Sequence, residues 1–213
     1  MIGADFNLAK KGEDLMQKTK LFLDMDNVLV DTLPVLNELA KKDDKVKHPD
    51  QVPGVFKDLP PIPGAINGVN LLKDRYDLYI LSTAPWLNAS AWQDKLLWLQ
   101  TYFGQSKTDP FYKKVVLTHD KGLVHFGGGI LLDDRPYHGA SAWLDSKANS
   151  TWLQYGYDEE LTWSNQLVPF LLTLADALNS HQGVLTKALS EANQDNFILH
   201  GDRTNFKSMA WEN

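Results

Sequence analysis

Short apolar runs alternate with amphipathic segments along most of the chain. The apolar runs predict buried strands, and apolar residues that recur at helical spacing predict helices packed on them. Alternation of this kind predicts an α/β fold, here a Rossmann-like three-layer sandwich with a mostly parallel sheet. Strands are expected at 21–26, 77–85, 115–118, 129–132 and 151–155, and helices at 32–47, 65–75, 88–103 and 164–179.

The distance between the first strand and the helix at 65–75 is too long and irregular for a simple crossover, and its second half is rich in proline and glycine. Residues 32–62 are therefore predicted to form a small helical cap inserted after the first strand. Residues 1–31 and 63–180 would form the core, beginning with a helical or loose preface over 1–19. Residues 181–213 would form a peripheral extension, with a helix and a mobile end.

Composition narrows the classes of partner. The net charge is −6 and the basic residues are scattered, so polymeric nucleic acid is not expected, while a small anionic ligand is. The absence of cysteine excludes disulfides, thiol catalysis and cysteine–zinc sites. No apolar run reaches 18 residues and the N-terminus lacks a signal-peptide pattern, so we expect a cytoplasmic protein that does not enter a membrane.

Four apolar runs finish in residues that can bind phosphate or a metal. Parallel sheets gather their ligands at the carboxyl ends of the strands, so these four endings should meet in one place. The runs read LFLDMDNVLVD, LYILSTAP, VVLTHDK and GILLDDRP.

The first ending carries Asp24 and Asp26, which point to the same side of an extended backbone. One carboxylate could attack a substrate while the other moves a proton, and both could bind Mg²⁺ through oxygen. Two acids at this spacing are also common in simple caps and turns, so the pair alone leaves that alternative open.

The remaining endings add a cation, two hydroxyls and a second acidic pair. Ser82 and Thr83 could bind phosphate oxygens or form a turn, and Lys121 could neutralise phosphate or lie on the surface. Asp133 and Asp134 follow a run that looks buried, where two adjacent carboxylates call for a cation.

Taken in order, DMDNVLVD, STAP, DK and DD resemble the motifs of the haloacid dehalogenase-like superfamily of aspartate-nucleophile phosphatases. PGVFKDLPPIPGA, ILSTAP, VVLTHDK and LLDDRP are more specifically similar to the 5'(3')-deoxyribonucleotidase family, over roughly residues 20–175. The family's cap lies between its first two motifs, as the predicted insert does here.

This resemblance implies a metal-dependent mechanism. Asp24 would be the nucleophile and a Mg²⁺ ligand, and Asp26 the acid/base whose backbone carbonyl also meets the metal. Asp133 and Asp134 would hold Mg²⁺ and its water, and the choice between them for direct ligation stays open.

The resemblance also implies a phosphate site in which Thr83 holds an oxygen, Ser82 helps, and Lys121 steadies both the phosphate and the nucleophile. Phe56 in the cap and Trp86 after the second motif could stack on a nucleobase. Alternatively, Phe56 anchors the cap to the core and Trp86 packs beneath the helix at 88–103.

The function expected is hydrolysis of a small phosphomonoester, a (deoxy)ribonucleoside 5'- or 3'-monophosphate. A phosphosugar phosphatase and a non-catalytic nucleotide-binding protein are the alternatives, and a homodimer is the assembly considered. The chain departs from mammalian members of the family at Ala84, where they have serine, and at Thr32, where they have an aromatic residue nearby.

Overall fold

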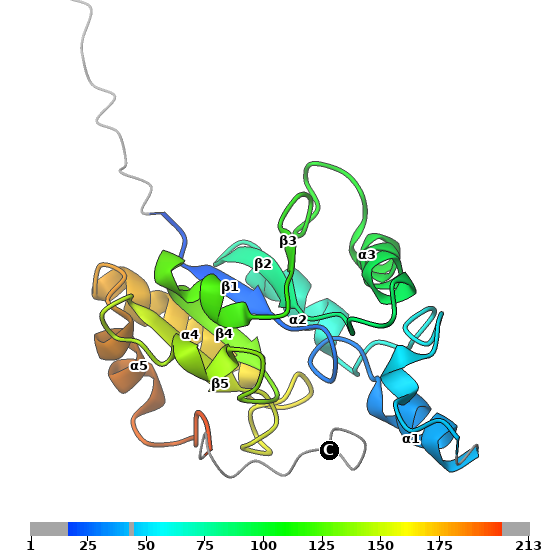
Figure 1. The fold of residues 1–213 in the computed structure, drawn as a ribbon. Coiled ribbons are helices and arrows are strands. Elements are labelled where there is room, and N and C mark those ends of the chain that lie inside the picture. The colour runs from blue at the N-terminus through cyan, green and yellow to red at the C-terminus, as the bar shows by residue number, and fades with distance from the viewer. Residues whose placement is uncertain (1–16, 43–44, 202–213) are drawn as a thin grey trace, which may run out of the picture.

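A computed structural model describes residues 17–42 and 45–201 of the chain (Figure 1). Its centre is a five-stranded sheet in which all strands run parallel, in the order β3-β2-β1-β4-β5. Strand β1, the first in sequence, is therefore central, and its carboxyl end lies between those of β2 and β4. The strands are β1 (Lys20–Leu23), β2 (Asp77–Ser82), β3 (Val115–Leu117), β4 (Gly129–Asp133) and β5 (Ser150–Gln154).

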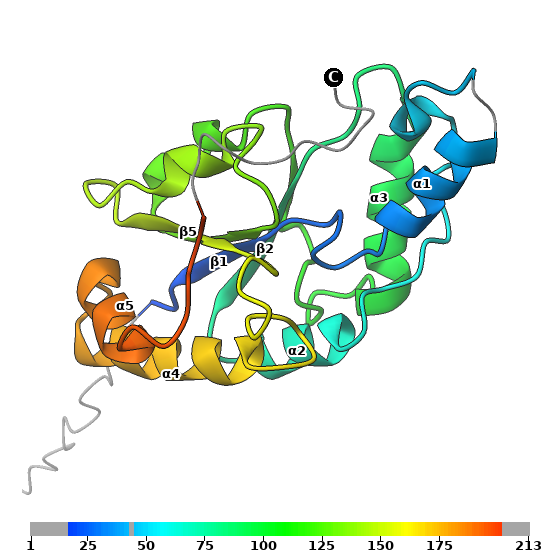
Figure 2. The ribbon, with the colours of Figure 1, turned by 90° about the horizontal axis from the view of Figure 1, so that it is seen from below.

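The sheet is covered on both faces (Figure 2). One face packs against the helices α2 (Ala65–Leu72), α4 (Leu167–Ser180) and α5 (Leu185–Asn193). The opposite face packs against short 3₁₀ turns, in which Trp143 is fully buried beside Phe22 and Trp152. The predicted three-layer α/β fold is confirmed, but turns rather than long helices build its third layer.

The segment between β1 and α2 contains helix α1 (Leu33–Lys42) and the 3₁₀ turn η1 (Pro49–Gln51). In both views α1 lies beyond the sheet, away from α2, α4 and α5 (Figures 1 and 2). The return of this segment is hydrogen-bonded to helix α3 (Ser90–Phe103), where Trp98 Nε1 donates to the Leu59 carbonyl at 2.8 Å. The insert is thus attached to α3 rather than to the helical layer under the sheet.

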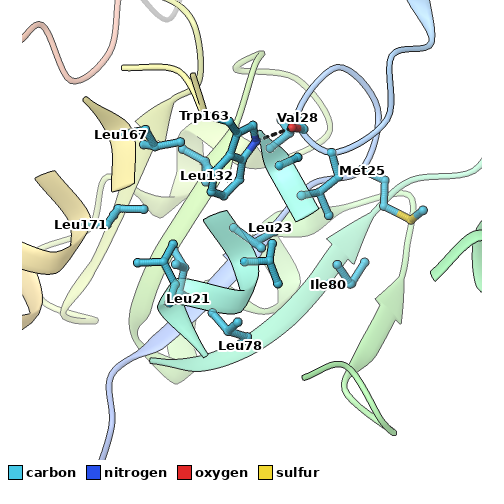
Figure 3. Close-up of a cluster of buried hydrophobic side chains, with 14 of the residues drawn as sticks. Leu21, Leu23, Met25, Val28, Leu78, Ile80, Leu132, Trp163, Leu167 and Leu171 are labelled. Carbon is cyan, nitrogen blue, oxygen red and sulfur yellow. Dashed lines mark hydrogen bonds between the residues drawn. The ribbon is translucent and has the colours of Figure 1, made fainter. Parts of the chain in front are cut away.

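The main core lies between the sheet and the helices α2 and α4, and it contains leucines from four strands, some of which Figure 3 shows. Trp163 closes this core towards the loop after β1, since its Nε1 donates to the Val28 carbonyl at 2.6 Å. Gly68 on α2 makes room for this ring: a Cβ there would lie 2.4 Å from Cε3 of Trp163. The loop that follows β1 is therefore braced from the far side of the core.

The strands and helices predicted between residues 21 and 179 are all present, most with shorter bounds, while β4 is one residue longer and β5 is displaced by one residue. The described helix after the first strand ends at Lys42, although a helix over 32–47 was predicted, because the apolar spacing stops at Ala40 while the charged residues continue. In the extension after residue 180, α5 packs on α4, and the Gln154 N–H at the end of β5 donates to the Leu199 carbonyl at 2.7 Å. Residues 1–16 of the preface predicted over 1–19, and residues 202–213 at the chain end, lie outside the described residues. None of the described helices combines the length and apolar character that crossing a membrane requires.

Candidate active site

Asp24 is the first residue beyond β1, and its N–H continues the sheet by donating to the Leu132 carbonyl at 3.0 Å. The chain then turns sharply, because the Met25 carbonyl accepts hydrogen bonds from the next residues of the loop, Leu29 among them at 2.8 Å. This turn leaves the Asp24 side chain buried at the centre of the carboxyl edge of the sheet. The apolar run before it dictates that place, since a central strand is buried on both faces.

Lys121 lies directly across from Asp24. Its Nζ is 3.1 Å from Asp24 Oδ2, and it also forms an ion pair with Asp133 Oδ2. All three side chains are buried. Burial alone would lower the pKa of Lys121, but the charges of Asp133 and Asp24 outweigh it and hold the pKa above its ordinary value. The lysine is therefore a permanent cation placed between two carboxylates.

Three carboxylates meet at this point. One oxygen from each of Asp24, Asp133 and Asp134 lies within 4.8 Å of the others. Burial raises the pKa of Asp133 to about 6, with Lys121 opposing and Asp24 adding to the rise. Burial and the neighbouring Asp133 raise the pKa of Asp134 well above its ordinary value. Three negative charges in so small a space are costly unless a cation compensates them.

Asp24, the third of these carboxylates, has its pKa shifted in the opposite direction. Burial by itself would raise the pKa of Asp24, but Lys121 and then Lys95 lower it, with a Ser82 hydrogen bond adding to their effect. The net result is a pKa below the ordinary value for an aspartate. Asp24 is thus held in its anionic form, which is the form that a nucleophile requires.

The same carboxylates fit a divalent metal. Asp24 Oδ1 and Asp134 Oδ1 are buried and have no hydrogen-bond partner. Both oxygens of Asp133, in contrast, are engaged: Oδ2 by Lys121, and Oδ1 by the Arg135 N–H at 3.1 Å. Hard oxygen ligands of this kind suit Mg²⁺. Two buried carboxylate oxygens that accept no hydrogen bond at one place are the structural sign that a cation fits there, although Arg135 Nε lies 3.7 Å from Asp134 Oδ1.

Lys95 on α3 is a second cation at the site, and it was not predicted from the sequence. Its side chain is 2% exposed, and its Nζ lies 2.6 Å from Asp26 Oδ2 and 3.2 Å from Ser82 Oγ. A signal for it existed: Lys95 follows Ala91 by four residues and precedes Trp98 by three, which puts it on the buried face of the helix. A lysine on that face needs a carboxylate partner.

The residues predicted to bind substrate lie in different surroundings. Ser82 is fully buried beside Lys95, and Thr83 follows it at the end of β2. Phe56 is only 4% exposed and lies under Lys95 Nζ, 5.0 Å from the ring centroid. This burial favours the alternative in which Phe56 anchors the insert. Trp86 is 80% exposed and meets the ring of His119 edge-on at 5.5 Å, so it does not pack beneath α3.

An all-parallel sheet with a buried Asp at the end of its central strand, a lysine across from it and an acidic pair at the end of the neighbouring strand is the arrangement of haloacid dehalogenase-like hydrolases. The family model for "5' nucleotidase, deoxy (Pyrimidine), cytosolic type C protein" matches residues 36–149. The chain belongs to this family, as the resemblance in its motifs predicted, and the activity class of the family is that of a nucleotide phosphomonoesterase.

Two relatives in sequence agree with this membership. A protein of Vibrio phage KVP40 named as a 5'(3')-deoxyribonucleotidase is 38% identical over 148 residues, which cover 68% of this chain and 81% of the phage protein. The human cytosolic-type 5'(3')-deoxyribonucleotidase is 34% identical over 94 residues, covering 43% of this chain and 44% of the human protein. A solved haloacid dehalogenase-like hydrolase of Burkholderia xenovorans aligns with 66% of this chain and 83% of its own, at 14% identity and a TM-score of 0.39.

Proposed function

We propose that the protein is a Mg²⁺-dependent nucleotidase that removes phosphate from deoxyribonucleoside monophosphates through a phosphorylated Asp24. The observation that carries this proposal is the state of Asp24: buried at the end of the central strand, anionic, paired with Lys121 through Oδ2, and with Oδ1 left without a partner. A purely structural ion pair would leave no carboxylate oxygen unsatisfied.

The reaction would proceed in two displacements. An oxygen of Asp24 attacks the phosphorus atom, the bond to the nucleoside oxygen breaks, and Asp26 donates a proton to that leaving oxygen. Water then attacks the phosphorus of the aspartyl-phosphate while Asp26 takes its proton, which releases inorganic phosphate and restores Asp24. Covalent catalysis divides one difficult step into two, and a placed proton donor contributes about 10²–10⁴ in rate.

Mg²⁺ would be held by Asp24 and Asp134, with the backbone carbonyl of Asp26 as a further ligand. The engagement of both Asp133 oxygens supports Asp134 as the direct ligand and gives Asp133 another role, which is to hold Lys121 in place. When bound, the metal supplies positive charge that compensates the phosphate oxygens during transfer.

The phosphate group itself would be bound by the chain's own cations and hydroxyls. Lys121 pairs with Asp24 and Lys95 pairs with Asp26, so two buried cations border the carboxylates of the site. Thr83 follows Ser82 at the end of β2 and would donate to a phosphate oxygen. A dianionic phosphate placed between two buried ammonium groups gains strong charge-assisted hydrogen bonds.

The nucleoside part of the substrate is inferred from the names of the relatives and from one surface feature. Trp86 follows the second motif by a single residue and exposes most of its ring, so a nucleobase could stack on it. A phosphosugar would leave this ring without a partner. The retained Asp24, Asp26 and Lys121 oppose the non-catalytic alternative.

The proposed function goes together with a proposed division of the chain into a core, a cap and an extension. Residues 32–62 would form the cap over a core made of 1–31 and 63–180, and 181–213 the extension. The expected location is cytoplasmic, in keeping with the word cytosolic in the name of the human relative. A homodimer stays a prediction.

The test is turnover of a panel of phosphomonoesters by the purified chain with Mg²⁺. Deoxyribonucleoside monophosphates should be hydrolysed faster than sugar phosphates, and the activity should vanish with a chelator and return when Mg²⁺ is restored. Preference for a sugar phosphate would change the assigned substrate but would leave the proposed phosphatase chemistry unchanged. Undiminished activity in metal-free, chelator-treated protein would contradict the metal site.

A further inference from the structure

Asn27, in the loop after β1, holds an unusual backbone conformation and makes two side-chain hydrogen bonds. Its φ is 57°, in the left-handed region that costs most non-glycine residues energy and that asparagine tolerates best. Its Nδ2 donates to Asp134 Oδ2 at 3.3 Å, and its Oδ1 accepts from Thr32 Oγ1 at 2.7 Å. Glycine would fit this backbone more easily, so the carboxamide has to be explained by what it contacts.

The two contacts fix which end of the carboxamide meets the carboxylate. A carboxylate that binds Mg²⁺ is ionised and only accepts hydrogen bonds, so Asp134 as a metal ligand requires the NH₂ end of the amide. The Thr32 hydroxyl satisfies the opposite, oxygen end, and Thr32 is only 1% exposed, so water cannot easily take its place. Without the hydroxyl, the amide could rotate and present its oxygen to Asp134.

The pair also connects three separate parts of the chain. Asn27 lies in the loop beside Asp26, Asp134 follows β4, and Thr32 immediately precedes helix α1 of the insert. Asp134 is held through Oδ2, while its buried Oδ1 accepts no hydrogen bond and lies 3.7 Å from Arg135 Nε. The carboxylate is therefore oriented through Oδ2 and keeps in Oδ1 an oxygen that accepts no hydrogen bond.

We infer that Asn27 and Thr32 are a positioning pair that orients Asp134 for Mg²⁺ and joins the start of the insert to the metal site. This inference rests on the proposed function, because it takes Asp134 as a metal ligand. Partners that orient a metal ligand in this way change metal affinity by about 10- to 100-fold when they are removed. The pair would thus set Mg²⁺ affinity without touching the metal or the substrate.

The alternative is that the pair only stabilises the loop. The two roles make opposite predictions for Asn27→Gly, because glycine relieves the left-handed backbone while it removes the carboxamide. A loop-stabilising role predicts lower stability with unchanged Mg²⁺ affinity. The positioning role predicts unchanged or slightly higher stability of the metal-free protein with weaker Mg²⁺ binding.

The experiment is calorimetric titration of metal-free protein with Mg²⁺ alone, without substrate, together with urea unfolding of each metal-free variant. Asn27→Gly should weaken binding by about 10- to 100-fold. Thr32→Val should weaken it in the same direction, and Thr32→Ser, which keeps the hydroxyl, should restore affinity close to that of the unchanged chain. The double variant Asn27→Gly with Thr32→Val should bind no more weakly than Asn27→Gly, since both changes remove one connection.

Folded Asn27→Gly protein with unchanged Mg²⁺ affinity would overturn the inference while leaving the metal site intact. Should Asn27→Gly fail to fold, Thr32→Val against Thr32→Ser gives the same comparison, and equal affinities in those two would also overturn it. Absence of Mg²⁺ binding to the unchanged chain is a different result, because it removes the proposed metal site itself.

Discussion

Lys95 Nζ lies 2.6 Å from Asp26 Oδ2, although the two residues come from the third helix and from the loop after the first strand. The ammonium group is buried, and its other contacts are the Ser82 hydroxyl and the ring of Phe56. The proposed acid/base residue is thereby fixed in place by a cation that also borders the proposed phosphate site. A buried lysine with these contacts is expected to act in the reaction and not only in folding.

Replacing this lysine should therefore damage catalysis. Lys95→Met keeps the length of the side chain but removes the charge, and we expect kcat for nucleotides to fall by about 10²–10³, as when one donor to a developing charge is lost. Steady-state kinetics on a deoxyribonucleoside monophosphate measure the effect.

Lys114→Met is the matched control, because Lys114 pairs with Asp77 at the same 2.6 Å but at the partly exposed amino end of β2. Its kinetics should equal those of the unchanged chain. Equal losses in both variants, or normal turnover in folded Lys95→Met, would contradict a role for Lys95 at the site.

Replacing Asp133 and replacing Asp134 should have different effects on Mg²⁺ binding. Asp134→Asn should abolish the thermal stabilisation that Mg²⁺ gives the unchanged chain, which is about 2.7 kcal/mol at a metal concentration 100 times the Kd. Asp133→Asn should keep much of that stabilisation and lose turnover, because Lys121 loses its main partner. Thermal unfolding with and without Mg²⁺ decides it, and the reverse pattern would make Asp133 the ligand.

Phe56 and Trp86, the two aromatic residues near the site, should differ in whether their replacement lowers stability or activity. Phe56→Ala removes a buried ring and should cost about 3–5 kcal/mol of unfolding free energy. Trp86→Ala should leave stability unchanged and weaken kcat/KM for deoxynucleotides by about 5- to 150-fold, with little change for a small aryl phosphate. If the aryl phosphate and the nucleotide lose activity equally in Trp86→Ala, stacking on Trp86 is ruled out.

The bracing of the loop after β1 gives a prediction of stability. Gly68→Ala should drive a methyl group into the ring of Trp163 and cost about 1–3 kcal/mol by overpacking. Gly127→Ala is the control, since its Cβ would meet only Lys20 Nζ at an ordinary 3.6 Å. Urea unfolding measures both, and equal stability of the two variants would show that the Trp163 ring can move aside.

Much of the fold was predictable because the local sequence patterns agree with the secondary structure that the chain adopts. Each apolar run that reads as a strand is one, and the polar residues at the strand ends do meet, as for Asp24 and Lys121, because a parallel sheet leaves them no other place. The third layer could not be predicted in the same way, since the 3₁₀ turns around Trp143 are too short to give a periodic pattern.

The parts of the site that the sequence did not indicate are those that depend on tertiary contacts. Lys95 is 69 residues from Asp26, and Asn27 is 107 residues from Asp134, so no local pattern joins either pair. Phe56 looked available for stacking because it stands in a loop-rich segment, but the packing of that segment on α3 buries it.

The proposed passage of phosphate through Asp24 is tested directly by trapping the phosphorylated residue. Enzyme mixed with a deoxyribonucleoside monophosphate and Mg²⁺ is quenched rapidly in acid, digested and analysed by mass spectrometry. One phosphoryl group is expected on the peptide that contains Asp24, accumulating further in Asp26→Asn with an aryl phosphate and absent in Asp24→Asn. Turnover by Asp24→Asn at a near-normal rate, or phosphate trapped on another residue, would contradict it.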